Sequence, residues 1–154
     1  MTWVWEHLGD IGGYAVSHAL LAGIPLIVGL LLALPLGWVA RRYPPIASVV
    51  VGGSSLLYTI PSLALFILMP LVLGSKILDA INVYVAMTIY TVALLVRTVA
   101  DALGAVPDAT RQAATAMGYR GFGRLVAVDL PLAVPVLAAG LRVAAVSNVS
   151  IVSV

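Results

Sequence analysis

The 154-residue sequence contains no cysteine and few charged residues. Without cysteine the chain has no disulfide bonds and no thiolate metal sites. Charged residues make up 9% of the chain and hydrophobic residues 62%, whereas soluble domains carry about 25% charged residues. So few charges cannot cover a water-exposed surface, and they leave no basic face for nucleic acid. The composition therefore predicts an integral membrane protein with the lipid bilayer, and no nucleic acid, as its partner.

The sequence also lacks the groups that would supply energy or catalysis. A phosphate-binding loop needs a lysine followed by serine or threonine, but the only lysine, Lys76, precedes an isoleucine. Transport driven by protons or sodium normally requires a carboxylate within a membrane span, and all six acidic residues lie outside the apolar runs. No paired catalytic groups and no metal-ligand spacing are present. We therefore expect no catalytic residue, no metal site and no cofactor bound by this chain.

Four apolar runs approach or exceed the roughly 20 helical residues that cross a bilayer. They cover residues 17–40, 46–73, 81–96 and 131–154. The second run contains Gly52, Gly53 and Pro61, which predicts a tilted or kinked span. Together the runs predict a single all-α domain over residues 1–154, a polytopic transmembrane bundle of about four helices. Because the last run reaches the final residue, we expect that a C-terminal part of this domain is missing.

The basic residues are unevenly distributed between the two sides of the predicted bundle. With alternating crossings, six of the eight fall on one side, within 41–42 and 97–124. Since loops rich in lysine and arginine stay in the cytoplasm, we expect residues 98–130 to form a cytoplasmic loop and the N-terminus to lie outside. The first residues are acidic and include Trp3 and Trp5. They predict interfacial anchors and no cleavable signal peptide.

The loop 98–130 contains a predicted helix of its own. Pro107 and Asp108 suit a helix start, residues 109–117 are rich in alanine, and Gly118 suits a C-terminal cap. One side of this helix is small, so that a partner could approach closely, and it carries Ala109, Ala113 and Ala116. The sequence therefore predicts a helix of about 10 residues presented on the cytoplasmic surface.

This loop resembles the EAA loop of bacterial ABC importer permeases. The family pattern is Glu-Ala-Ala, three residues, Gly, nine residues and Ile-x-Leu-Pro. The matching residues, with the same spacing, are Gln112-Ala113-Ala114, Gly118 and Val128-Asp129-Leu130-Pro131. Gln112 stands where the family has glutamate, and Val128 where it has isoleucine. The resemblance implies a type I importer permease whose coupling helix docks into a cytoplasmic ATPase, with coupling residues Arg111, Gln112, Ala113, Ala114, Met117, Gly118, Arg120, Leu130 and Pro131.

Two further segments are similar to permeases of the glycine betaine, choline and carnitine branch, namely residues 58–65 and 106–146. The resemblance implies a bacterial cytoplasmic membrane protein that passes an osmoprotectant (glycine betaine, choline, carnitine or a proline-like solute). It also implies a cytoplasmic ABC ATPase that binds ATP and Mg²⁺, a second permease subunit, the same or related, and an extracytoplasmic binding protein. The alternatives are an importer permease for another small solute, such as an amino acid or methionine, and a small four-helix proton-coupled exporter.

Several polar or helix-breaking residues within the apolar runs are candidates for a pathway or hinge: Thr59, Pro61, Ser62, Arg142 and Asn148. Each also has a structural interpretation. Pro61 suits a tolerated kink, Arg142 a protein contact or an interfacial position, and Asn148 a hydrogen bond across a helix interface. Four aromatic residues suit either a cation–π cage or packing between spans: Tyr58, Phe66, Tyr84 and Tyr90.

Overall fold

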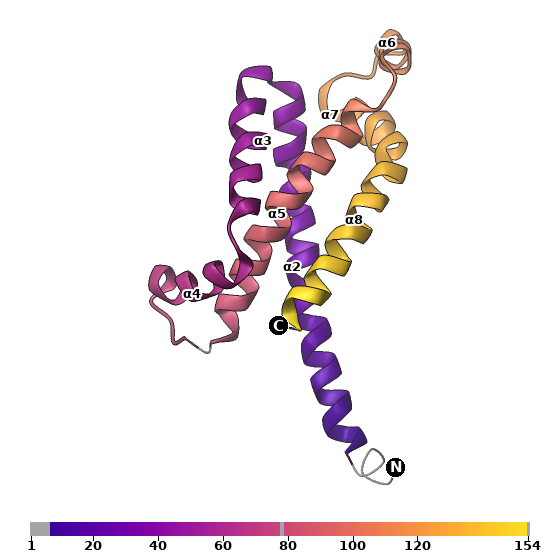
Figure 1. The fold of residues 1–154 in the computed structure, drawn as a ribbon. Helices are drawn as coiled ribbons and strands as arrows, with labels where there is room; N and C mark the ends of the chain where they lie inside the picture. The colour runs from indigo at the N-terminus through magenta and orange to yellow at the C-terminus, as the bar shows by residue number, and fades with distance from the viewer. Residues whose placement is uncertain (1–6, 78, 154) are drawn as a thin grey trace.

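The computed structural model describes residues 7–77 and 79–153, and helices make up most of this part of the chain (Figure 1). In chain order they are α2 (Leu8–Arg42), α3 (Pro44–Thr59), α4 (Ser62–Leu73), α5 (Ala80–Gly104), α6 (Asp108–Ala116), α7 (Gly121–Arg124), the π-helix η1 (Leu125–Asp129) and α8 (Leu130–Val152). Trp3 and Trp5, the predicted anchors, lie outside the described residues.

Three helical stretches are long and apolar enough to cross a membrane. They are α2, α5 and the continuous run from α7 through η1 to α8, Gly121–Val152. A fourth crossing is added if α3 and α4 together count as one broken span. The prediction of an all-α bundle with about four spans is thus confirmed.

The second predicted span is divided into two helices rather than kinked. The axes of α3 and α4 meet at 102°, and Figure 1 shows α4 turning away from α3 to the side of the bundle. The break lies at Ile60 and Pro61, both extended, with ψ values of 128° and 131°. A residue before proline avoids the helical region, and Pro61 has no N–H for the helical ladder. Both effects act at one point, so the helix stops and restarts.

Helix α5 holds the bundle together, because it contacts each of α2, α3, α4 and α8. Its inner face contributes Leu95, Val96 and Val99 to the main core, each almost fully buried. Helix α2 approaches this face through glycines. A Cβ atom on Gly29 would lie 2.6 Å from Thr91, and one on Gly37 would lie 2.6 Å from Val99. Such close approach is typical of membrane helices, where small residues let backbones pack directly.

The helices of the third and fourth spans extend beyond the apolar runs that predict them. Helix α5 continues past residue 96 to Gly104, so that Arg97 and Asp101 lie on its last turns and pair at 3.7 Å with exposed side chains. The polar segment 98–130 therefore opens as helix. Residues 105–107 link α5 to α6. The fourth span begins at Gly121, before Pro131, because the backbone passes from α7 into α8 through η1 without a break.

Candidate functional site

Helix α6 forms at the position that the sequence predicts, and its ends have physical causes. Pro107 precedes the first helical residue, and Asp108 places a carboxylate in the first turn, where it complements the helix dipole. At the other end Gly118 adopts φ of 94°, a conformation that favours glycine. The Tyr119 N–H donates to the Ala114 carbonyl at 3.0 Å, and the Gly118 N–H to that of Thr115 at 3.0 Å. These two bonds form a Schellman cap that ends the helix.

One face of α6 is exposed and carries the three predicted small residues, Ala109, Ala113 and Ala116, together with Gln112. Ala114, on the side that faces the bundle, is 1% exposed. Met117 follows at the C-cap with 70% of its surface exposed, and Gly118 and Arg120 are also exposed. An exposed row of small residues beside a flexible methionine gives a partner protein a shallow surface to approach closely.

The buried side of α6 is fixed by a cluster of charges. Arg111 lies with Nε 3.5 Å from Asp129 Oδ1, and Arg124 lies with Nε 3.4 Å from Asp129 Oδ2. The Asp129 side chain is only 9% exposed. Arg111 also donates to the carbonyl of Leu103, and Arg124 to the hydroxyl of Thr115 at 3.2 Å. One carboxylate thus connects α6, the end of α5 and the start of α8.

The aspartate of this cluster is positioned by a local irregularity of the backbone. Asp129 is the last residue of the π-helix η1, and Leu130 and Pro131 directly follow as the first residues of α8. Leu130 is partly buried against the main core, and Pro131 is exposed. π-helical turns are rare and occur often at functional sites. Here the turn lies where the family motif ends.

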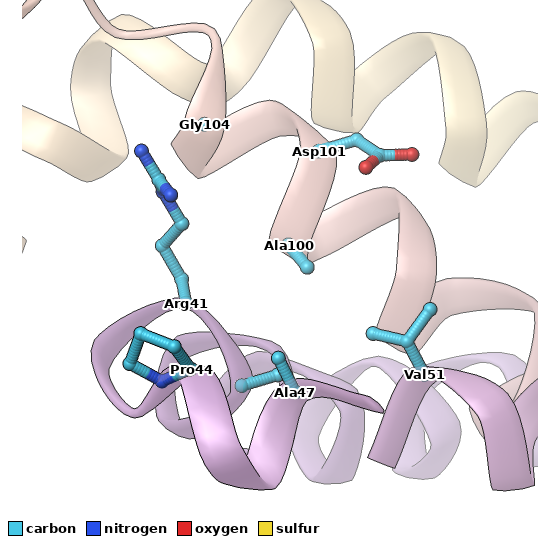
Figure 2. A pocket seen from close by; sticks show the side chains of 8 residues that line it. Arg41, Pro44, Ala47, Val51, Ala100, Asp101 and Gly104 are labelled. Carbon is cyan, nitrogen blue, oxygen red and sulfur yellow. The ribbon is translucent and has the colours of Figure 1, made fainter. Parts of the chain in front are cut away.

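Most of the predicted cytoplasmic basic residues gather at one end of the bundle. Arg41 and Arg42 line a cavity of about 250 Å³ together with Arg111, Arg124 and Asp129. Arg41 also lines a second cavity, together with Asp101 and Gly104. Figure 2 shows the Arg41 side chain extending toward Gly104, whereas the Asp101 carboxylate points away from Arg41. The ends of α2 and α5 and the start of α8 therefore share one side, as the alternating crossings predict.

The structure places the first three pathway candidates at the break between α3 and α4. Thr59 is exposed and its hydroxyl donates to the Leu56 carbonyl at 2.6 Å, Pro61 is exposed, and Ser62 begins α4. Tyr58 stacks on Tyr90 of α5, with ring centroids 4.8 Å apart. The break therefore has an aromatic contact to α5, and two of the four aromatic candidates come together there.

Asn148 lies at a buried junction of three helices. Its amide nitrogen is 3.0 Å from the Thr91 hydroxyl and donates to the Ala22 carbonyl at 3.2 Å. Asn148 and Thr91 are at most 1% exposed. This geometry matches the alternative of a bond across a helix interface. Arg142, on another face of α8, is exposed, and among the described residues it has no hydrogen bond or ion pair.

Four residues whose side chains take part in these contacts were not among the sequence candidates: Thr91, Thr115, Arg124 and Asp129. Asp129 occupies the variable position of the Ile-x-Leu-Pro motif, so the motif itself gave it no weight. The charge of Asp129 could have identified it, because an acidic residue at the start of a membrane span needs a cationic partner if it is buried. Thr91 lies in an apolar run, where only its hydroxyl distinguishes it from its neighbours. The sequence does not show how α5 and α8 align, so it could not pair Thr91 with Asn148.

The chain has recognisable relatives among known proteins. Residues 25–154 match the family described as "Binding-protein-dependent transport system inner membrane component". The osmoprotectant import permease protein OsmW of Salmonella typhimurium is 32% identical over 152 residues, 97% of this chain and 70% of OsmW. The glycine betaine/carnitine/choline transport system permease protein OpuCD of Bacillus subtilis is 29% identical, over 93% of this chain and 63% of OpuCD. The choline transport system permease protein OpuBB of the same species is 30% identical, over 87% and 60%.

The chain thus spans 60% to 70% of the length of these three relatives. No solved structure matches it.

Proposed function

Because the chain belongs to the family of binding-protein-dependent transport system inner membrane components, we propose that it is the permease subunit of an ATP-driven importer for a small osmoprotectant. The substrate class rests on the relatives, whose names refer to osmoprotectants, glycine betaine, carnitine and choline. Two such subunits, identical or related, enclose the pathway in the cytoplasmic membrane of a bacterium. An extracytoplasmic binding protein delivers the solute.

The observation that carries this proposal is the exposed small-residue face of α6. This face is not covered by any other described part of the chain, whereas the opposite face is anchored to α8 through Arg111 and Asp129. Such a helix is suited to transmit movement, because a partner can grip one side while the other side is attached to the spans. The partner is a cytoplasmic ATPase that binds ATP and Mg²⁺, since this chain has no phosphate-binding loop of its own.

The mechanism follows from these attachments. Closure of two ATPase subunits on ATP draws the two α6 helices together. The Asp129 cluster carries that displacement into α8, and the link at residues 105–107 carries it into α5. The spans then change from an inward-facing to an outward-facing arrangement, in which the binding protein releases its solute. Gln112, in place of the family's glutamate, contacts the ATPase through hydrogen bonds rather than an ion pair.

Co-purification with the ATPase tests the coupling role. Ala113→Arg adds a long side chain to the exposed face and should abolish complex formation and substrate-stimulated ATP hydrolysis. Ser48→Arg is the matched control, because Ser48 is exposed near the start of α3, at the same end of the bundle, and lies outside both α6 and the link to α5. If the transporter with Ala113→Arg assembles and hydrolyses ATP like the control, the coupling role is wrong.

Uptake into cells or proteoliposomes tests the substrate class separately. Labelled glycine betaine and choline should enter only with ATP and the binding protein present. Unlabelled methionine should not reduce their uptake. Uptake of methionine alone would assign the permease to another small solute. Proton-driven efflux of a solute in the absence of ATP would support the small four-helix exporter and reject the proposal.

A further inference from the structure

An apolar cavity of about 310 Å³ lies beside the arginine-rich end of the bundle. Its eight lining residues are all apolar or aromatic, and they include Leu34, Trp38, Phe122 and Val126. Phe122 is 71% exposed and Val126 49% exposed, so the cavity opens to the outside of the bundle. Its volume lies at the lower end of the range for ligand pockets, about 300–1,000 Å³.

This apolar cavity adjoins the arginine-lined cavity of about 250 Å³, because Trp38, Leu103 and Leu125 line both. The polar cavity has four arginines and one aspartate, which leaves three net positive charges. The carboxylate of Asp129 is already shared by Arg111 and Arg124. Arg41 and Arg42 therefore have no anionic partner within the cavity. A further hollow beside Trp38 adds Arg120 to the same basic surface.

We propose that the two adjoining cavities together bind one anionic phospholipid. Its phosphate lies against Arg41 and Arg42, and one acyl chain enters the apolar cavity past Trp38. Charge complementarity favours this occupant, since basic pockets between membrane helices attract anionic headgroups. Trp38 lies at the boundary of the two cavities, and tryptophan is enriched at the level of the lipid headgroups. A zwitterionic lipid would leave the cavity's net charge uncompensated.

The site would link lipid composition to the anchor of α6. Arg124, which holds Asp129 and Thr115, lines the same polar cavity as Arg41 and Arg42. A bound phosphate there attracts Arg124 as well and fixes the end of α2 next to η1. Occupancy therefore stabilises the joint between α6 and α8, an effect that is independent of which solute the transporter carries.

Lipid retention measured by native mass spectrometry tests the proposal on the full transporter that contains this chain. After delipidation in detergent, the protein is titrated with phosphatidylglycerol, phosphatidylcholine or inorganic phosphate. Phosphatidylglycerol should bind at one saturable site per chain and raise the thermal unfolding temperature. Equal retention of phosphatidylcholine would overturn the headgroup assignment, and an equal thermal shift with phosphate would show an anion site without a lipid.

Two variants separate the polar and apolar halves of the site. Arg42→Gln should weaken retention of phosphatidylglycerol by about fivefold, the loss expected for one arginine near an anionic lipid. Val126→Trp fills the apolar cavity from its exposed rim and should abolish retention of phosphatidylglycerol. The matched controls are Arg97→Gln and Val134→Trp, exposed residues that line neither cavity. Unchanged retention in Arg42→Gln and Val126→Trp, with both proteins folded, would reject the site. Binding of a second copy of this chain at the apolar cavity in place of lipid would assign the cavity to a protein interface.

Discussion

The Nε atom of Arg111 lies 3.5 Å from Oδ1 of Asp129, and this contact joins α6 to the turn that precedes α8. Their side chains are 16% and 9% exposed. Within the described residues neither atom has a hydrogen-bond partner. The pair is therefore held by charge at a distance just beyond the usual hydrogen-bond length of about 2.7–3.2 Å. A shift of α6 by a few tenths of an ångström would bring Arg111 and Asp129 within hydrogen-bond distance. The contact between α6 and the turn before α8 can therefore become shorter and stronger.

Replacing the carboxylate should loosen this joint. Asp129→Asn removes both ion pairs, which leaves Arg124 without an anion and Arg111 with only the exposed Asp108. The free energy of unfolding should fall by about 2–3 kcal/mol, less than the roughly 3–5 kcal/mol lost when a fully buried pair is broken. The substitution should also reduce substrate-stimulated ATP hydrolysis more than it reduces binding of the ATPase. Thermal unfolding in detergent and ATPase assays of the assembled transporter measure the two effects. Asp108→Asn is the control, because that carboxylate, 83% exposed, lies 3.5 Å from Arg111 and exposed pairs contribute at most about 1 kcal/mol.

The glycines of α2 should tolerate no side chain where they meet α5. Gly37→Ala places a Cβ atom 2.6 Å from Val99, and such overpacking costs about 1–3 kcal/mol. Gly23→Ala, where nothing lies within 4 Å of the added atom, should leave stability unchanged or slightly raised. Unfolding temperatures of the two variants make the comparison. Val99→Gly removes both side-chain atoms that the new Cβ atom would meet, so the loss in the double variant should be smaller than the sum of the two single losses. Additive losses would show that the two residues do not meet.

The Asn148–Thr91 contact should contribute measurably but modestly to stability. In membrane proteins side-chain hydrogen bonds between helices are worth about 0.6 kcal/mol and at most about 1.7. A double-mutant cycle with Asn148→Leu and Thr91→Val should give a coupling energy in that range. Additive effects would contradict the hydrogen bond. If uptake falls far more than stability in Asn148→Leu, the residue also serves the pathway.

Restoring the backbone N–H at the α3–α4 break should straighten the two helices. Pro61→Ala removes the restriction on Ile60 and allows the helical ladder to continue. Spin labels on the exposed residues Val49 and Leu71 would then lie farther apart than in the 102° arrangement. Pro70→Ala, a proline inside α4, is the control and should leave the distance unchanged. An unaltered distance in Pro61→Ala would mean that packing on α5 rather than the proline sets the angle.

The sequence was most informative where a feature depends on local chemistry. The alanine run of 109–116 and Gly118 define α6 to within one residue at each end, because caps and helix formers act over a single turn. Hydropathy likewise identifies the spans, since bilayer thickness sets their length. Pro61 marked a disturbance, but the sequence showed neither the 102° angle nor the packing of α4 against Ala86 and Ile89 of α5.

The features that sequence did not anticipate depend on contacts between distant residues. The charge cluster needs α6 and η1 in register, since Arg111 and Asp129 are 18 positions apart. Hydropathy also ended the third span at Arg97, because a charged residue stops an apolar run even when the helix itself continues into water. The glycines at 29 and 37 have a small residue between them, Ala33, at the four-residue spacing typical of close helix packing. The sequence shows this pattern of small residues, but it does not show that Thr91 and Val99 of α5 pack against it.

The three residues between α5 and α6 set a mechanical limit on the molecule. A fully extended tripeptide reaches only about 10 Å, and Pro107 within it is already extended, with ψ of 137°. The slack is therefore small, and any larger pull on α6 must tilt α5 as a rigid rod. Because that rod touches the other four membrane helices, force applied at one tip spreads to all of them through helix packing, in addition to the path through the Asp129 cluster.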